Sequence, residues 1–254
     1  MSDSAIISQL TVRGINRMRR RPSLIVPALI MPAFFLIAFS GSFNSLASLP
    51  DFPTTNIRSW MAPYAILQGA SFAGVGAAGG TATDIELGFF DRLLLAPCSR
   101  VILMVGPLGY SAVRALLPTG AVLVLALALG ADLPGGVLGV VMLTVASVGV
   151  ALVFGTLGLA IVYRLKTLRA LALVQIVIFV FMFLSIGQVP LRYQSGWLHS
   201  VARVNPMTNI LRMARQGFIG PVTWQQTWPG LLAVTLLVSG FGAAALRGLR
   251  RFLP

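Results

Sequence analysis

VLGVVMLTVASVGVALVFGTLGLAIV, residues 137–162, runs for 26 residues without a charged side chain. A membrane-spanning helix needs about 20 apolar residues, because a rise of about 1.5 Å per residue must cross roughly 30 Å of hydrocarbon. Backbone polar groups cannot stay unpaired in lipid, so a stretch of this kind predicts an α-helix that crosses a membrane. This segment decides the fold class.

Five other stretches meet the same test: residues 23–43, 59–82, 107–129, 170–188 and 229–247. Of the 254 residues, 57% are hydrophobic and only 10% are charged. A soluble domain carries about a quarter charged residues, so lipid must replace water over much of this surface. The sequence predicts an all-α integral membrane protein with six transmembrane helices.

The charge distribution predicts the topology. A net charge of +13 is compatible with nucleic acid binding on composition alone, but the apolar background argues against it. An even number of spans places both termini on one side, and on that side lie 13 Lys and Arg residues against 5 on the other. Both termini are therefore predicted to be cytoplasmic. All four tryptophans fall on the outer side: Trp60, Trp197, Trp224 and Trp228.

Catalytic and metal-binding motifs are missing from the sequence. Cys98 and His199 are the only residues of their kinds, and there is no GxxxxGK[ST], HExxH or CxxC motif. No acid lies in the middle of a predicted span, where a proton relay would need one. The sequence thus predicts no catalytic residue, no metal and no cofactor of its own, so another chain must supply the energy for any uphill transport.

Residues 1–22 are predicted to form an amphipathic helix on the inner membrane surface, ahead of a six-span domain at 23–254. One face carries Ile7, Leu10, Gly14 and Met18, and the other carries Arg13, Arg17 and Arg20. Two short outer helices are predicted at 194–204 and 206–216, with Asn205 as the cap, Pro206 at the first helical position and Gly217 and Gly220 as stops. On the second of these, Asn209, Arg212 and Gln216 are expected to face away from the apolar surroundings.

DIELGFFDRLLLAPCSR, residues 84–100, holds half of the six acids. As a helix it has an apolar arc, with Asp84, Gly88, Asp91 and Arg92 on the other side, free to meet a soluble partner. Glu86 falls within the apolar arc, and it either starts the helix, where the dipole favours an acid, or pairs with a cation. Arg114, inside the third span, either reaches the headgroups or contacts Glu86 or a substrate.

Two motifs resemble those of a known family. Glu86, Gly88, Arg92, Leu93, Pro97, Ser99 and Arg100 are similar to the E-x-G-x-x-x-R-L-x-x-x-P-x-S-R signature of type-2 ATP-binding-cassette (ABC) permeases of the daunorubicin-resistance kind. The family's second motif, "FLS … NPxT … R-x-G", is similar to this chain at residues 183–185, 205–208 and 215–217. The RRRP at 19–22 resembles the entry to the family's first span.

The resemblance implies a homodimer, or a pair with a homologous permease, bound to a nucleotide-binding ATPase that holds ATP and Mg. It implies that residues 84–100 form a coupling helix against this ATPase, using Asp84, Glu86, Gly88, Asp91, Arg92, Pro97 and Arg100. It also implies an outer gate at 194–219 with Asn205, Pro206, Arg215 and Gly217, and a pathway along the second and fifth spans. Candidates for the pathway are Phe72, Gly76, Gly80, Phe179 and Phe183.

The expected function is that of an exporter permease in a bacterial inner membrane, where it contacts membrane lipids. Its expected substrate is an amphipathic drug, antibiotic or lipid-like molecule, and export of an antibiotic would confer resistance. Export of a polysaccharide or lipid-linked glycan is the alternative within transport. A six-span membrane enzyme or scaffold without an ATPase is the alternative from another class. The substrate itself is not named by the sequence.

Overall fold

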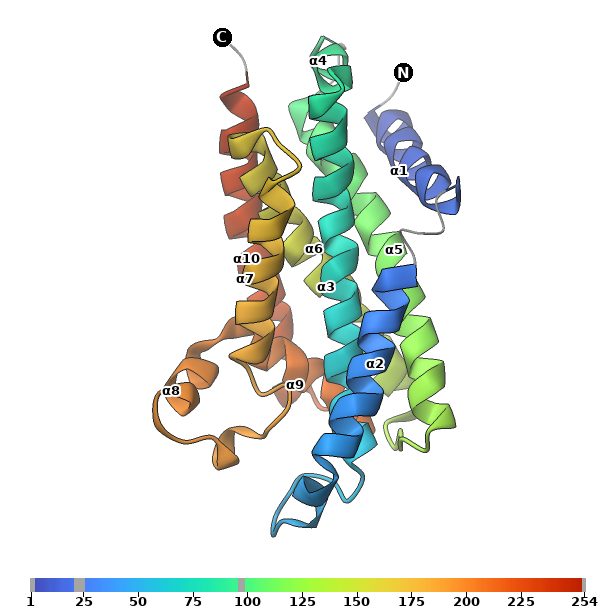
Figure 1. Ribbon diagram of the computed structural model, residues 1–254, viewed down its shortest axis with the longest axis vertical. Coiled ribbons are helices and arrows are strands. Elements are labelled where there is room, and N and C mark those ends of the chain that lie inside the picture. The colour runs from blue at the N-terminus through green and yellow to red at the C-terminus, as the bar shows by residue number, and fades with distance from the viewer. Residues whose placement is uncertain (1–2, 21–25, 96–98, 253–254) are drawn as a thin grey trace.

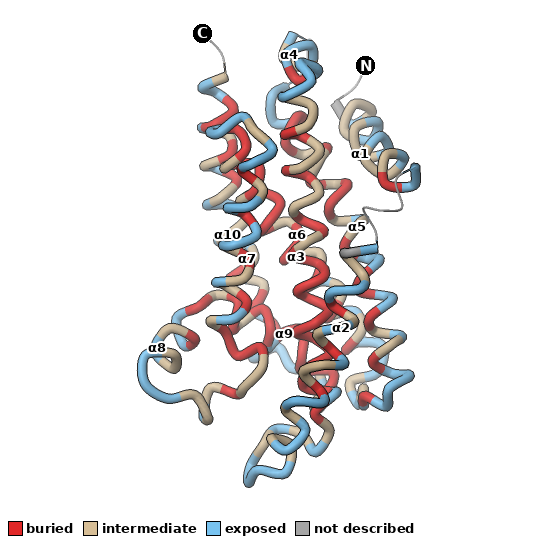
Figure 2. The backbone as a smooth tube through the Cα atoms, in the orientation of Figure 1, coloured by how far each residue is buried: buried red, intermediate tan, exposed pale blue. Residues whose placement is uncertain are grey.

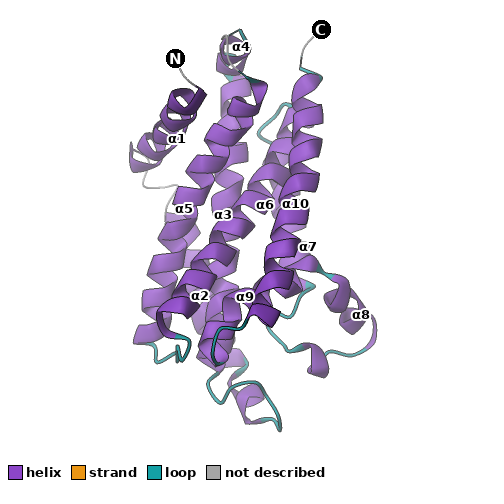
Figure 3. Cartoon of the chain, turned by 180° about the vertical axis from the view of Figure 1, so that it is seen from behind, coloured by secondary structure: helices purple, strands orange, loops and turns teal. Residues whose placement is uncertain are grey.

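The computed structural model describes residues 3–20, 26–95 and 99–252, and within these ranges the regular elements are all helices (Figure 3). Their order and bounds are α1 Asp3–Arg20, α2 Val26–Ser42, η2 Asn44–Ser48, α3 Ile57–Glu86, α4 Phe89–Leu94, α5 Arg100–Ala128, α6 Gly136–Leu165, α7 Ala170–Phe183, η3 Leu191–Tyr193, α8 Gly196–Val204, α9 Pro206–Ile219 and α10 Trp224–Arg250.

Each of the six predicted spans overlaps a helix: α2, α3, α5, α6, α7 and α10. By length and composition, α5, α6 and α10 are long and apolar enough to cross a membrane, and residues 28–42 and α7 are shorter apolar helices. The prediction of an all-helical membrane protein is confirmed. Six as the number of crossings stays a prediction.

Helix α3 forms the centre of the bundle, with α2, α5, α6, α7 and α9 packed around it (Figures 1 and 2). Twenty of its 30 residues are buried. A Cβ atom on Gly74 would lie 2.5 Å from the carbonyl oxygen of Ala151 on α6, so the two backbones nearly touch. Small residues permit such close approach between membrane helices. Because α3 packs against protein rather than lipid, it needs less apolar surface than its neighbours.

Large apolar side chains point outward from the surrounding helices. Val124, Val137, Ile176 and Leu236, on α5, α6, α7 and α10, are each more than half exposed. An apolar exterior on this scale marks a surface that water does not cover. The surface of the bundle therefore agrees with a lipid environment.

The two ends of the bundle differ. The termini and α4 lie at one end of the long axis, here called the α4 end, and η2 and α8 lie at the opposite end, called the α8 end (Figure 1). Termini at the same end are what an even number of crossings requires.

Helix α1 is amphipathic as predicted, but its apolar face packs on α5. A Cβ on Gly106 would lie 2.6 Å from the Cβ of Leu10, and one on Gly14 would lie 2.6 Å from the ring of Tyr110. The hydroxyl of Thr11 also donates a hydrogen bond to the carbonyl of Gly106, at 3.1 Å. The apolar stripe expected to contact the membrane surface therefore joins α1 to the bundle.

Helix α7 ends at Phe183, and the prediction that this span runs to residue 188 is wrong. Carbonyl groups at a helix end need donors from elsewhere. The side-chain amide of Asn205 donates to the carbonyls of Phe181 and Leu184, at 2.8 and 2.7 Å, and Arg215 donates to the carbonyls of Ile186 and Gly187. Side chains from 21 or more residues away thus take the place of the next helical turn.

Candidate functional site

The segment 84–100 is not one helix, which corrects the sequence prediction. Helix α3 continues to Glu86, Gly88 has a φ of 68°, and α4 then runs for only six residues. Residues other than glycine rarely adopt this left-handed conformation, so Gly88 breaks the helix and redirects the chain. Pro97 lies outside the described residues, and Arg100 begins α5.

Helix α4 is anchored on one face and exposed on the other. Phe90 is 2% exposed, and its ring centroid lies 5.8 Å from that of Tyr163 and 5.3 Å from that of Phe252. Asp91 and Arg92 are exposed on the opposite side. The short helix thus presents a charged pair at the α4 end while Phe90 holds it against α6 and the end of α10.

Asp84 is occupied within the chain rather than free for a partner. The guanidinium of Arg13 on α1 contacts both of its carboxylate oxygens, at 2.9 and 3.2 Å. The same guanidinium lies 4.2 Å from the ring centroid of Phe89. Arg13 therefore links α1 to the chain on both sides of Gly88.

Glu86 has neither of the environments expected from the sequence. It lies in the last turn of α3, where the helix dipole disfavours an acid. Its Oε1 accepts hydrogen bonds from the backbone N–H of Leu168, at 2.7 Å, and from the hydroxyl of Thr167, at 3.1 Å. Both donors belong to the loop between α6 and α7, so Glu86 joins the end of α3 to the start of α7.

A cavity of about 580 Å³ opens between α1, α3, α5 and α7, and Ala28 and Met31 of α2 also contribute to its lining. Four of the five residues predicted to line a pathway meet there: Phe72, Gly76, Gly80 and Phe179. Phe183 lies further along α7, where its ring contacts Tyr64 and Phe179. The role of these residues in transport stays a prediction.

Three arginines also line this cavity: Arg13 and Arg17 of α1 and Arg114 of α5. A substrate contact was one of the alternatives predicted for Arg114, but no pathway role was predicted for the other two. A signal in the sequence could have found part of this site. Phe72, Gly76, Gly80 and Asp84 recur every four residues, which places them on one face of α3.

The predicted outer-gate residues are parts of a buried clamp. Arg215 is 2% exposed and donates hydrogen bonds to the carbonyls of Trp60, Ile186 and Gly187, at 3.0, 2.9 and 2.7 Å. Its guanidinium also lies 3.6 Å from the ring centroid of Trp60. Burial lowers the pKa of Arg215 to about 9, so the side chain remains charged at neutral pH. Arg215 thereby joins α9, α3 and the end of α7.

Helix α9 is capped as predicted. The side-chain oxygen of Asn205 accepts a hydrogen bond from the N–H of Met207, at 2.9 Å, and Pro206 is the first helical residue. Gly217 is not a stop, because α9 continues to Ile219 and Gly217 packs against α6. Gln216, expected to face outward, is buried and donates to the hydroxyl of Thr227 at 2.8 Å, which ties α9 to α10.

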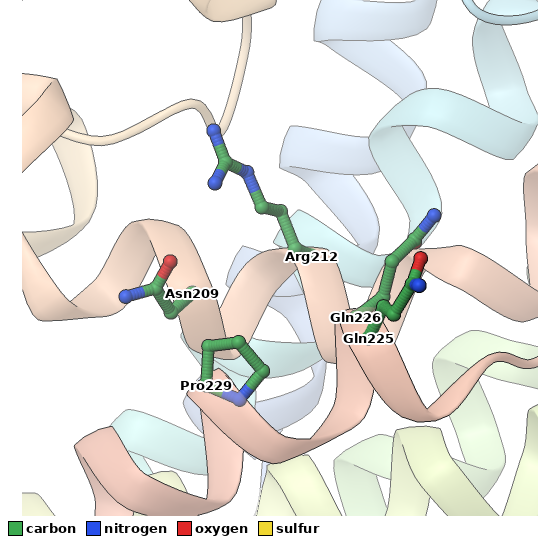
Figure 4. Close-up of a pocket in the computed structure, with 5 residues that line it drawn as sticks. All are labelled: Asn209, Arg212, Gln225, Gln226 and Pro229. Atoms are coloured by element: carbon green, nitrogen blue, oxygen red, sulfur yellow. The ribbon is translucent and has the colours of Figure 1, made fainter.

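A second hollow of about 340 Å³ lies between α9 and the start of α10. Figure 4 shows Arg212 reaching away from α9 to one side, with Gln225 and Gln226 extending to the other; Asn209 and Pro229 complete the lining. Arg212 is exposed, as predicted. This polar hollow lacks the apolar lining of the larger cavity.

No cluster of three or more His, Cys, Asp or Glu residues is present in the part of the chain that the structure describes. The apolar bundle, the charged α4 and the cavity between the helices define a helical membrane protein with an internal amphipathic site. Comparison with known proteins identifies its family.

The chain belongs to the ABC-2 type transporter family, whose model matches residues 6–219. It is also 26% identical over 227 residues to a protein of Pyropia yezoensis named "Putative transport permease ycf38", with 87% of this chain and 76% of that protein covered. The resemblance drawn from the two motifs is confirmed, and the chain is a transport permease subunit of this family.

Proposed function

We propose that this permease is the membrane subunit of an exporter, and that ATP hydrolysis on a separate subunit drives it. The ATPase docks at α4, two permease copies form the complex, and both termini face the cytoplasm of a bacterial cell. The substrate is amphipathic, of the antibiotic or lipid-like kind. The observation that carries this proposal is the exposed pair Asp91 and Arg92 on a helix that Phe90 anchors.

The contacts around α4 connect it to other helices, so that movement of α4 by a docked partner is transmitted to them. Arg13 links α1 to both Asp84 and Phe89, and Glu86 links α3 to the loop before α7. Displacement of α4 by a partner would therefore act on α1, α3 and α7 together. These three helices line the cavity of about 580 Å³.

The lining of the cavity favours an amphiphile over a glycan. The rings of Phe72 and Phe179 meet edge to face, with centroids 5.8 Å apart. This arrangement offers an apolar surface rather than two flat faces on which sugar rings could stack. The arginines add a cationic region to the same cavity.

Reversing the charges of α4 tests the docking proposal. The variant Asp91→Lys/Arg92→Glu keeps the net charge but inverts the pair, so we expect the tagged chain to lose most of the phosphate-loop ATPase that copurifies with the wild type. The recovered ATPase is quantified by mass spectrometry. Asp51→Arg/Arg192→Asp is the matched control, because it exchanges an exposed ion pair at the α8 end. Equal recovery of the ATPase with both variants would contradict docking at α4.

Removing the carboxylate of Glu86 tests the link to α7. Glu86→Ala deletes the acceptor for both the Leu168 N–H and the Thr167 hydroxyl, and the loss of these charge-assisted hydrogen bonds at an exposed site is expected to lower substrate-stimulated ATPase activity about threefold to tenfold. Glu86→Gln keeps an uncharged acceptor and should give an intermediate value. Thr167→Val removes only the hydroxyl contact. Wild-type stimulation in Glu86→Ala, at equal membrane levels, would show that this link does not transmit the signal.

A further inference from the structure

The charge of the large cavity is unbalanced. Its described lining includes three guanidinium groups and one carboxylate, which gives a net charge of +2. The carboxylate belongs to Asp84, and Arg13 contacts both of its oxygens. Arg17 forms a longer ion pair with the same carboxylate, with its Nη1 3.9 Å from Oδ1 of Asp84. The guanidinium of Arg114 donates a hydrogen bond to the hydroxyl of Tyr110, at 3.4 Å, which leaves its charge in place. One carboxylate is thus shared by two arginines, and the described lining keeps its net positive charge.

Two glycines of α3 bring these arginines against one helix face. A Cβ on Gly76 would lie 2.3 Å from Nη1 of Arg114, and one on Gly80 would lie 3.8 Å from Nη1 of Arg17. The two glycines are one turn apart, a rise of about 6 Å. The two guanidinium groups, from α5 and from α1, thus approach neighbouring turns of α3.

The polarity of the cavity changes along the same stripe. Phe72, Gly76, Gly80 and Asp84 follow one another at four-residue intervals, over a length of about 18 Å. Phe72 contacts Phe179 at the apolar end, and Arg17 and Arg114 lie along the part that leads toward α4. A ligand that matches this gradient has an anionic head and an apolar body.

We infer that the cavity between α1, α3, α5 and α7 binds an anionic amphiphile. Arg114 and Arg17 hold its phosphate or carboxylate head, and its apolar body lies against Phe72 and Phe179. Guanidinium groups bind such oxyanions through paired, charge-assisted hydrogen bonds. This inference rests on the proposed function for its role, since it names the substrate class of that transporter, but its binding test needs no ATPase.

The test uses the full chain in a neutral detergent without nucleotide, and a dodecyl phosphate with a photoreactive diazirine in its alkyl chain. Irradiation is expected to label peptides that contain Phe72 and Phe179. Unlabelled dodecyl phosphate should compete with the probe, and dodecanol should not. Equal competition by dodecanol would overturn the inference, because an apolar pocket alone would then explain the binding.

Substitutions locate the head group. Arg114→Gln and Arg17→Gln should each weaken the affinity for the probe about tenfold, the effect of losing a charge-assisted contact. Arg250→Gln on α10 is the matched control, because it removes one exposed charge outside the cavity and should leave the affinity unchanged. Gly76→Ala keeps every charge but displaces the flexible end of Arg114, so it should also weaken binding. Unchanged affinity in Arg17→Gln and Gly76→Ala would overturn the site even if Arg114→Gln misfolds.

Two further arms identify the source of the ligand and separate this inference from the proposed function. In phosphatidylcholine nanodiscs, competition by added phosphatidylglycerol would identify a bilayer lipid as the occupant, and persistent labelling would identify a single-chain amphiphile; either result supports the site. A chain that binds the probe but recovers no ATPase would refute the proposed function and retain the site. Recovery of the ATPase without phosphate-dependent labelling would do the reverse.

Discussion

Replacing Arg215 with methionine is expected to lower the free energy of unfolding of the purified chain by about 3 kcal/mol or more. Methionine fills much of the same space but donates no hydrogen bonds. The carbonyls of Trp60, Ile186 and Gly187 would then be buried without their present donor, and each unsatisfied buried group costs about 1–3 kcal/mol. Thermal and detergent-induced unfolding in mixed micelles would measure the loss.

Two variants of α9 test whether this loss of stability is specific to the hydrogen bonds of Arg215. Arg212→Met removes an exposed guanidinium (Figure 4) and is expected to change the stability by less than about 0.5 kcal/mol. Arg215→Lys keeps a positive charge, but an ammonium group lacks the planar fork that serves three carbonyls and stacks on Trp60. Its stability should fall between those of the wild type and Arg215→Met. If Arg215→Met were as stable as Arg212→Met, the clamp would not hold the α8 end together.

The helices were predictable because lipid imposes a simple rule. An apolar run of about 20 residues has to be helical in a membrane, and this rule alone located residues 137–162 within α6 and the five other apolar stretches within or near α2, α3, α5, α7 and α10. The amphipathic α1 followed from periodicity in the same way. Local rules of this kind need no knowledge of which helices are neighbours.

Several of the missed features depend on contacts between distant residues. Glu86 accepts its hydrogen bond from a residue 82 positions away, and Arg215 contacts the chain 28 to 155 positions away. The early end of α7 follows from such partners, which periodicity does not reveal. The break at Gly88 is different, because its signal is local. A glycine just after the end of a helix commonly adopts the left-handed conformation that terminates the helix.

These contacts change the picture of the predicted outer gate. The family resemblance implied that Asn205, Arg215 and Gly217 belong to an outer gate, and each of them fastens α9 to another helix or to the end of α7. A gate at the α8 end would therefore have to move α9 together with α3 and α6. Whether these residues gate transport stays a prediction.

Gly217→Ala is expected to destabilise the chain by about 1–3 kcal/mol, the usual cost of forcing an extra group into a packed interior. A Cβ at this position would lie 2.4 Å from the Cα of Gly139, and the N–H of Gly135 donates to the carbonyl of Gly217 at 2.9 Å. Both neighbours are backbone atoms of α6 or its cap, so no side-chain movement can relieve the clash.

A matched glycine separates this clash from general effects of alanine in a helix. A Cβ on Gly240 of α10 would meet nothing within 4 Å, so Gly240→Ala should be neutral or stabilising, since alanine favours a helix by about 1 kcal/mol. Gly139→Ala should resemble Gly217→Ala, and the double variant should cost less than the sum, because one separation of α6 and α9 relieves both clashes. If the losses of stability in the two single variants added up in the double variant, the two glycines would act at independent contacts. The close contact between α9 and α6 would then not couple them.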